Sequence, residues 1–373
     1  MKIIFQIKEW ILRFLMILMA VMRSFVKENR ISRNDIKRIL FIQFGGLGDM
    51  VLITPAIRSI NKNFPEAEIS ILGSNLYNSD FLFNFPNVVE IRELDIYALD
   101  MRQIFKQFFW KALFQTIRFL RKRRFDLLIT FRSLKLIDWL FIEWVFVFFS
   151  RAGFTIGINP DYLPRHSVYC RWKIDSELKG QHYTESFLQL LEMAGIPACN
   201  RKTMFPIGKA AKKNAEILLS GITDSQPRVC IHPGGTRIVL EKELWHPSNY
   251  ASIAKHLTQK GIFVIIVGSG EDLKSAETIC KENPDCLDLT SRTTIEEMAA
   301  IIQRVDIFIG NDSGPFHIAA AVGTPAIGIF TRTKDEPEYY NYPMRNVFVF
   351  KSNFTEPPTV DGVLKKVNAI LSK

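Results

Sequence analysis

Short apolar runs that end in glycine-rich turns occur in two separate series along this chain. In the first series, residues 38–44 lead into Gly45-Gly-Leu-Gly48. In the second, residues 228–232 lead into Pro233-Gly-Gly235. Segments with helical apolar spacing follow these turns, and further strand candidates follow the helices. Strands that alternate with helices are typical of α/β domains with parallel sheets. The sequence therefore predicts an α/β protein with two Rossmann-like domains whose parallel sheets face a central cleft.

The order of these elements divides the chain into four segments. A length of 373 residues is enough for two domains, each with its own core. A polar stretch at residues 200–226 separates the two series of strands. We expect a basic apolar leader at residues 1–35, a first Rossmann-like domain at 36–205, a second at 206–358, and a helix at 359–373 that packs back on the first domain.

Positive charge is concentrated in two parts of the chain. The net charge is +10, of which residues 1–38 carry +6 and residues 102–135 carry +9, so the remainder is acidic. Both segments are rich in Phe, Leu, Ile and Trp, which is typical of membrane-surface elements and unlike most nucleic-acid-binding patches. We therefore expect a membrane surface at residues 1–26 and 102–135, and no nucleic-acid partner.

The leader has several interpretations. Its uninterrupted apolar stretch, Phe14–Met22, is too short to span a bilayer. A signal peptide fits its basic start, but no cleavage site of small residues follows. An in-plane membrane helix and a helix packed on protein both fit. For the apolar segment at residues 134–149, a buried helix and a lipid-facing helix both remain open.

The turn at Gly45–Asp49 admits three interpretations. A dinucleotide site is disfavoured, because Val51 stands where a third glycine belongs and the next strand ends without an acid. Asp49 fits a helix cap, which requires no chemistry. It also fits a general base, because α/β proteins place their chemistry at the carboxyl ends of strands.

Loops in the second half have the composition of a nucleotide-diphosphate site. Small residues in His232-Pro-Gly-Gly-Thr236 and in Gly310–His317 let backbone N–H groups approach an anion, and a helix start adds its dipole. Glu271 follows another strand and is placed to accept ribose hydroxyls. The five cysteines are scattered without metal-ligand spacing, so we expect neither a metal nor another cofactor, and a reduced, cytoplasmic setting.

Together these motifs resemble glycosyltransferase family 9, the ADP-heptose:lipopolysaccharide heptosyltransferases. The resemblance covers roughly residues 37–350. It rests on the strand-G-G-L-G-D-x-x-x-x-x-P start at Ile39–Pro55, His232-Pro-Gly-Gly235, Trp245-His-Pro247, Gly268–Glu271, Gly310–His317, and the middle segments Phe125–Arg132 and Ala152–Gly157.

This resemblance implies a GT-B fold and an inverting, metal-independent transfer of a sugar, heptose from ADP-heptose, to a lipopolysaccharide-core or related envelope glycan. Asp49 matches the base. The donor-binding residues implied by motif and position are His232, Gly234, Gly235, Thr236, Lys242, Glu271, Asp312, Ser313, Gly314 and His317. Gly46, Arg132 and His182 are candidates for the acceptor side. We expect a peripheral protein on the cytoplasmic face of the inner membrane.

Two positions depart from the family pattern. Glu243 stands where the family has a phosphate-binding Lys, with Lys242 and Arg237 nearby, and Arg332 and Lys334 lie where a G-P-T-like turn is common. These departures keep a second enzyme open, one with the same fold but another nucleotide sugar and surface-glycan acceptor. A non-catalytic, membrane-bound scaffold is the alternative of a different class.

Overall fold

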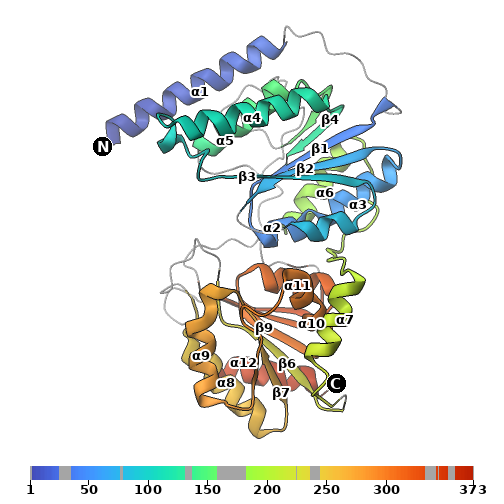
Figure 1. The fold of residues 1–373 in the computed structure, drawn as a ribbon, viewed down its shortest axis with the longest axis vertical. Coiled ribbons are helices and arrows are strands. Elements are labelled where there is room, and N and C mark those ends of the chain that lie inside the picture. The colour runs from blue at the N-terminus through green and yellow to red at the C-terminus, as the bar shows by residue number, and fades with distance from the viewer. Residues whose placement is uncertain are drawn as a thin grey trace. The chain divides into compact units, whose positions relative to one another are not determined.

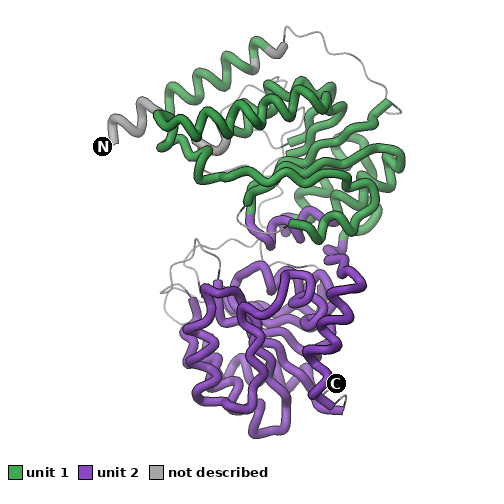
Figure 2. The backbone as a smooth tube through the Cα atoms, viewed as in Figure 1, with its two compact units in different colours: residues 1–45, 55–179, 184–201 green, residues 46–54, 180–183, 202–373 purple. Residues whose placement is uncertain are grey.

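The computed structural model describes residues 2–24, 35–75, 79–130, 137–157, 182–223, 225–235, 244–331, 342, 344–351 and 358–372. The chain forms two compact units that are interleaved in sequence (Figure 2). One unit comprises residues 1–45, 55–179 and 184–201, and the other comprises residues 46–54, 180–183 and 202–373. The chain therefore crosses between the units at more than one point.

A parallel sheet with the strand order β3-β2-β1-β4-β5 forms the centre of the first unit (Figure 1). Its strands are β1 (Arg38–Gln43), β2 (Glu68–Ser74), β3 (Val88–Leu94), β4 (Leu127–Thr130) and β5 (Phe154–Ile156). The central strand β1 is apolar from Ile39 to Ile42 and buried along that length, as expected of a parallel strand covered on both faces.

Two helices of the first unit pack on a third, the apolar helix α5 (Ile137–Ser150). The other helices of this unit are α1 (Lys2–Ser24), α3 (Thr54–Asn63), α4 (Gln107–Arg123) and α6 (Tyr183–Met193), with short 3-10 helices η2 (Asp80–Asn84) and η3 (Met101–Gln103). Both α1 and α4 pack on α5. Ile142, Trp144 and Phe146 of α5 are buried, so this part of the apolar segment at 134–149 is a core helix. Within the described ranges, no helix is both long and apolar enough to cross a bilayer.

The second unit is built on a parallel sheet with the order β11-β10-β9-β6-β7-β8 (Figure 1). Its strands are β6 (Arg228–His232), β7 (Phe263–Ile266), β8 (Leu287–Asp288), β9 (Ile307–Asn311), β10 (Ala326–Phe330) and β11 (Val347–Lys351). Its helices are α2 (Leu47–Leu52), α7 (Lys209–Leu218), α8 (Pro247–Gln259), η6 (Gly270–Asp272), α9 (Leu273–Glu282), α10 (Ile295–Ile302), α11 (Gly314–Val322) and α12 (Val360–Leu371).

Helix α2 belongs to the second unit although it directly follows strand β1 of the first. It packs on α11 at very short range. A Cβ atom at Gly48 would lie 2.4 Å from Cδ2 of His317, and one at Gly314 would lie 2.9 Å from Cδ2 of Leu47. Glycine on each helix therefore permits this contact. Residues 46–54, which the sequence analysis assigns to the first domain, pack with the second.

The C-terminal helix α12 also differs from the expectation. The sequence-based expectation was that this helix packs on the first domain, whereas in the structure it packs on α8 of the second unit. Val363 and Val367, one helical turn apart, are fully buried in the core of that unit. Trp245 extends the contact, because its indole N–H donates to the carbonyl oxygen of Pro358 at 2.9 Å. An apolar helix face identifies a buried helix, but the sequence does not say which core buries it.

Candidate functional site

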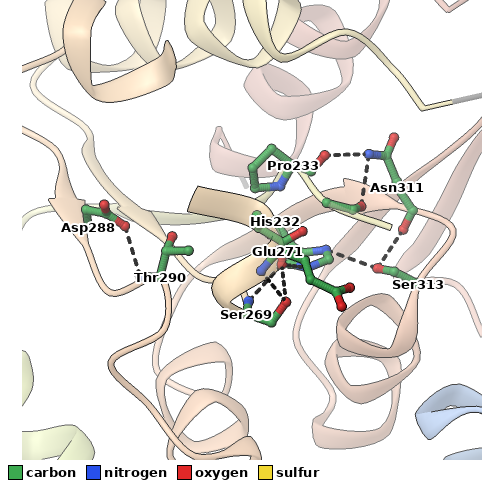
Figure 3. A network of polar contacts seen from close by, with 10 residues as sticks. His232, Pro233, Ser269, Glu271, Asp288, Thr290, Asn311 and Ser313 are labelled. Atoms are coloured by element: carbon green, nitrogen blue, oxygen red, sulfur yellow. Dashed lines mark hydrogen bonds and ion pairs between the residues drawn. The ribbon is translucent and has the colours of Figure 1, made fainter. Parts of the chain in front are cut away.

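Three loops of the second unit meet at one edge of its sheet. Residues 232–235, 268–271 and 311–314 follow strands β6, β7 and β9, which are adjacent in the order β9-β6-β7. Carboxyl ends of parallel strands lie at the same edge of a sheet, where α/β proteins bind their ligands. Figure 3 shows the polar network formed by these loops. The structure thus brings together the loops that the sequence analysis selected.

Asn311 and Ser313 join the β9 loop to the β6 loop. The side-chain nitrogen Nδ2 of Asn311 donates to the carbonyl oxygens of Pro233 and Gly234 at 2.8 and 3.1 Å (Figure 3). The hydroxyl of Ser313 lies 3.1 Å from Nδ1 of His232 and is hydrogen-bonded to it. All these contacts are buried, so the two loops form a fixed backbone surface.

Asp272 joins the β6 loop to the β7 loop, and the sequence analysis missed it. Its Oδ2 atom accepts hydrogen bonds from the backbone N–H and the hydroxyl of Ser269 at 2.7 and 3.0 Å, and lies 3.5 Å from Nε2 of His232. Burial by itself would raise the pKa of Asp272, but the interactions with His232 and Ser269 outweigh it, and the pKa lies below its ordinary value. The capping box that starts at Ser269 is the sequence pattern that could have identified Asp272.

Close packing against Asp272 explains why glycine stands at two positions of these loops. A Cβ atom at Gly234 would lie 1.7 Å from Oδ1 of Asp272, and one at Gly268 would lie 2.8 Å from its Oδ2. Neither loop can therefore carry a side chain there while the carboxylate keeps its place. Glu271, the residue that the sequence analysis selected, is exposed on η6 beside Asp272.

Helix α11 presents its N-terminus next to this network. Ser313 is the N-cap residue, but its side chain makes no capping hydrogen bond because it contacts His232 and the carbonyl oxygen of Asn311 instead. Backbone N–H groups at such a helix start, together with the helix dipole, favour an anion. Asp312, Ser313 and Gly314 stand at this start, as the sequence analysis expects for a diphosphate site.

Asp49 lies in the first turn of α2. Its Oδ2 atom accepts a hydrogen bond from the backbone N–H of Gly46 at 2.7 Å, which completes a capping interaction. This contact fixes the orientation of the carboxylate. A structural cap and a catalytic base are compatible with it, since a carboxylate oxygen has lone pairs for more than one partner. Gly46 contributes its backbone to this turn.

His317 and His182 lie in a buried cluster of the same unit. Nδ1 of His317 is hydrogen-bonded to the hydroxyl of Tyr342, and the ring of Tyr342 lies 4.1 Å from that of His182, centroid to centroid. Burial lowers the pKa of His317 to about 4. Burial, and to a lesser extent His317, lowers the pKa of His182 to about 3. Both rings are therefore neutral near pH 7.

This cluster changes the interpretation of His182. From its position in the sequence, His182 was a candidate acceptor ligand of the first domain, but the residue belongs to the second unit and is 2% exposed. Thr236, Lys242 and Arg132 lie outside the described residues, as do Glu243, Arg237, Arg332 and Lys334.

The fold and the loops define a class of protein. Two α/β units with parallel sheets, one of which carries small-residue loops and a helix start at the carboxyl edge of its sheet, are those of the GT-B fold. The sequence profile described as "Glycosyltransferase family 9 (heptosyltransferase)" matches residues 113–359. The chain belongs to this family, and it is a glycosyltransferase.

Known proteins resemble the chain over most of its length. "Lipopolysaccharide heptosyltransferase 3" of Escherichia coli is 27% identical over 322 residues, which are 84% of this chain and 89% of that protein. "Lipopolysaccharide core heptosyltransferase OpsX" of Haemophilus influenzae is 23% identical over 304 residues, 79% of each chain. A solved structure of E. coli heptosyltransferase WaaC with ADP has a TM-score of 0.69 at 16% identity, and covers 89% of this chain and 99% of its own. That structural likeness shows the shared GT-B fold.

Proposed function

We propose that this chain transfers heptose from ADP-heptose to a sugar of the lipopolysaccharide core, with inversion and without a metal ion. The heptosyltransferases that resemble this chain, and the ADP bound in a solved structure of the same fold, support this choice of acceptor and donor. One observation carries the proposal. The helix with Asp49 packs directly on the helix whose N-terminus forms the candidate diphosphate site.

We assign the donor to the loop network of the second unit. The N–H groups at Ser313 and Gly314 bind the diphosphate, with the dipole of α11 in support. The glycines at 234 and 235 admit the donor close to the backbone, and Glu271, which is exposed on η6, accepts the ribose hydroxyls. His232 and His317 hold these loops in place through the contacts described above. Asp312 lies beside His317, with its Oδ1 atom 3.9 Å from Nε2 of that ring. Thr236 and Lys242 complete the proposed set.

Asp49 is the proposed general base. As the acceptor hydroxyl attacks the anomeric carbon, its proton passes to the carboxylate of Asp49, and the bond from the anomeric carbon to the diphosphate oxygen breaks. Negative charge then develops on the leaving ADP, where the helix start of α11 stabilises it. Attack on the face opposite the leaving group inverts the anomeric centre. General-base catalysis of this kind contributes about 10²–10⁴-fold to a rate.

The first experiment compares the wild-type protein with Asp49→Asn. We expect kcat with ADP-heptose and a heptose-deficient lipopolysaccharide acceptor to fall about 10²–10⁴-fold, whereas the Kd for ADP-heptose changes little. Asparagine keeps the size of the side chain and an acceptor for the Gly46 N–H. Full transfer by Asp49→Asn would contradict the assignment of the base.

A donor panel tests the sugar nucleotide. We expect ADP-heptose to be used and UDP- and GDP-sugars to be rejected, and transfer to continue in EDTA. Preference for another nucleotide sugar would instead support a different surface-glycan transferase. Failure to bind any nucleotide sugar would support a scaffold. We further propose that the enzyme works as a peripheral protein on the cytoplasmic face of the inner membrane, where a lipid-anchored acceptor is available.

A further inference from the structure

Helix α1 exposes a broad apolar face. From Trp10 to Met22, eight apolar residues are exposed, and Trp10 itself is 75% exposed. The opposite face is packed, because Leu12 and Met16 are buried in the core that includes α5. At about 100° of rotation per residue, the exposed side chains span nearly half of the helix circumference. Soluble proteins rarely leave such a continuous apolar face in water.

Helix α4, which packs on the same helix α5, exposes aromatic and basic side chains together. Trp110 and Phe114 are exposed one turn apart, with ring centroids 6.0 Å apart. Lys111, Arg118 and Lys122 are exposed on the same side by helical rotation. The helix contains no acidic residue. Phe105, two residues before the helix, is 96% exposed.

These two exposed faces have the composition of an in-plane membrane element. Trp and Phe are favoured at the boundary between headgroups and acyl chains, and Lys and Arg are attracted to anionic headgroups. A second copy of this chain fits the surface poorly, because pairing of the same faces would bring the basic residues of two α4 helices together. The charge therefore favours an anionic bilayer as the occupant.

We propose that the exposed faces of α1 and α4 form a docking surface for an anionic lipid bilayer. In this arrangement α1 lies in the plane of the interface with its apolar face toward the acyl chains, while α5 holds both helices from the protein side. The inference deepens the proposed function and rests on it for the lipid-anchored acceptor. Vesicle binding itself requires neither donor nor acceptor, so the two proposals can fail separately.

The test is flotation of the full chain with vesicles of phosphatidylcholine alone or with phosphatidylglycerol added. One variant combines Lys111→Gln, Arg118→Gln and Lys122→Gln. Its matched control removes three exposed charges of α7, in the second unit, with Lys209→Gln, Lys212→Gln and Lys213→Gln. Each basic residue near the surface strengthens binding about fivefold, so the α4 variant should lose about a hundredfold in affinity for anionic vesicles. The α7 control should bind like the wild type.

A second pair of variants tests the apolar face. Trp10→Ser with Phe14→Ser should abolish flotation with either vesicle, whereas the control Ile217→Ser with Leu273→Ser, also exposed apolar residues, should not. Thermal unfolding and transfer to a detergent-solubilised acceptor should be unchanged in the α1 and α4 variants. If the α4 variant and the α7 control lost the same affinity for anionic vesicles, net charge alone would explain the binding, and the proposal would be overturned. A dimeric wild type would also overturn the proposal if two results held together. The Trp10→Ser, Phe14→Ser variant would have to be monomeric, and vesicles would have to leave the wild-type dimer intact.

Discussion

At the scale of the residue, the loop network depends on one buried carboxylate. Asp272 contacts His232 from the β6 loop and Ser269 from the β7 loop, and its position forbids a Cβ atom at Gly234 or Gly268. The glycines in these loops therefore have two roles in our account. They leave room for the carboxylate, and they present bare backbone to the proposed diphosphate. The sequence motif does not show the first of these roles, whereas the geometry does.

The neutral imidazole of His182 predicts a pH dependence of stability. Its pKa is about 3 in the folded protein, against an ordinary value of 6.5. As the pH falls below about 6.5, His182 binds a proton in the unfolded chain but not in the folded chain. The free energy of unfolding therefore decreases until the pH approaches the pKa of His182 in the folded protein. We expect His182→Phe, which keeps a ring beside Tyr342, to remove this loss. Urea unfolding between pH 7 and pH 4 measures it.

The expected loss in the free energy of unfolding follows from the difference between the folded and unfolded pKa values of His182. Between pH 7 and pH 4, the wild type should lose about 2–3 kcal/mol more than His182→Phe. Parallel stability curves for the two proteins would show that His182 titrates normally in the folded state.

At the scale of the element, the contact between α2 and α11 decides where Asp49 lies. Two short helices approach closely because each offers a glycine to the other, Gly48 against the ring of His317 and Gly314 against Leu47. The turn that carries Asp49 is thereby fixed to the loop that carries Asp312 and Ser313. We attribute to this contact the alignment of the proposed base with the proposed donor site.

Substitution of Gly48 tests this packing. In Gly48→Ala, the added Cβ would lie 2.4 Å from Cδ2 of His317, so the ring of His317 or one of the two helices must shift. We expect a loss of about 1–3 kcal/mol in the free energy of unfolding, typical of overpacking, together with a lower kcat for transfer. Chemical denaturation and steady-state kinetics measure the two effects.

A matched control is available in the same unit. Among the described residues, none places an atom within 4 Å of a Cβ position at Gly221, so Gly221→Ala should leave both quantities nearly unchanged. In a double-mutant cycle, His317→Ala should relieve most of the destabilisation caused by Gly48→Ala. Additive effects would locate the strain elsewhere.

At the scale of the whole molecule, the interleaving of the two units matters for the reaction. The chain leaves the first unit after β1, contributes α2 to the second unit, and returns at residue 55. The proposed base and the proposed donor loops therefore belong to one unit. In our proposal, contacts within this one unit set the distance from Asp49 to the α11 loop.

Hydrogen exchange tests whether α2 responds to the donor together with the second unit. When ADP binds, we expect the amides of residues 47–52 to gain protection together with those of residues 311–317, because α2 packs on α11. Residues 55–63 of α3, in the first unit, should change little. Mass spectrometry after deuterium labelling measures both. Protection of the α11 loop without protection of α2 would show that the two move independently.

Much of the architecture was readable from local patterns. Continuous apolar runs such as Ile39–Ile42 identified parallel strands, and the loops after three strands of the second unit do meet at one edge, as the sequence predicted. The resemblance to glycosyltransferase family 9 was confirmed by the profile match and the relatives. These features were accessible because strand burial and motif order are written in consecutive residues.

The sequence by itself determined the two parallel-sheet units, the family, and the loops that form the candidate site. Only the tertiary structure decided that α2 packs on the second unit, that α12 packs on α8, and that Asp272 holds the β6 and β7 loops together. The reason is physical. An apolar helix face or a buried carboxylate shows that a partner is needed, but the partner is chosen by shape and distance between segments far apart in the chain.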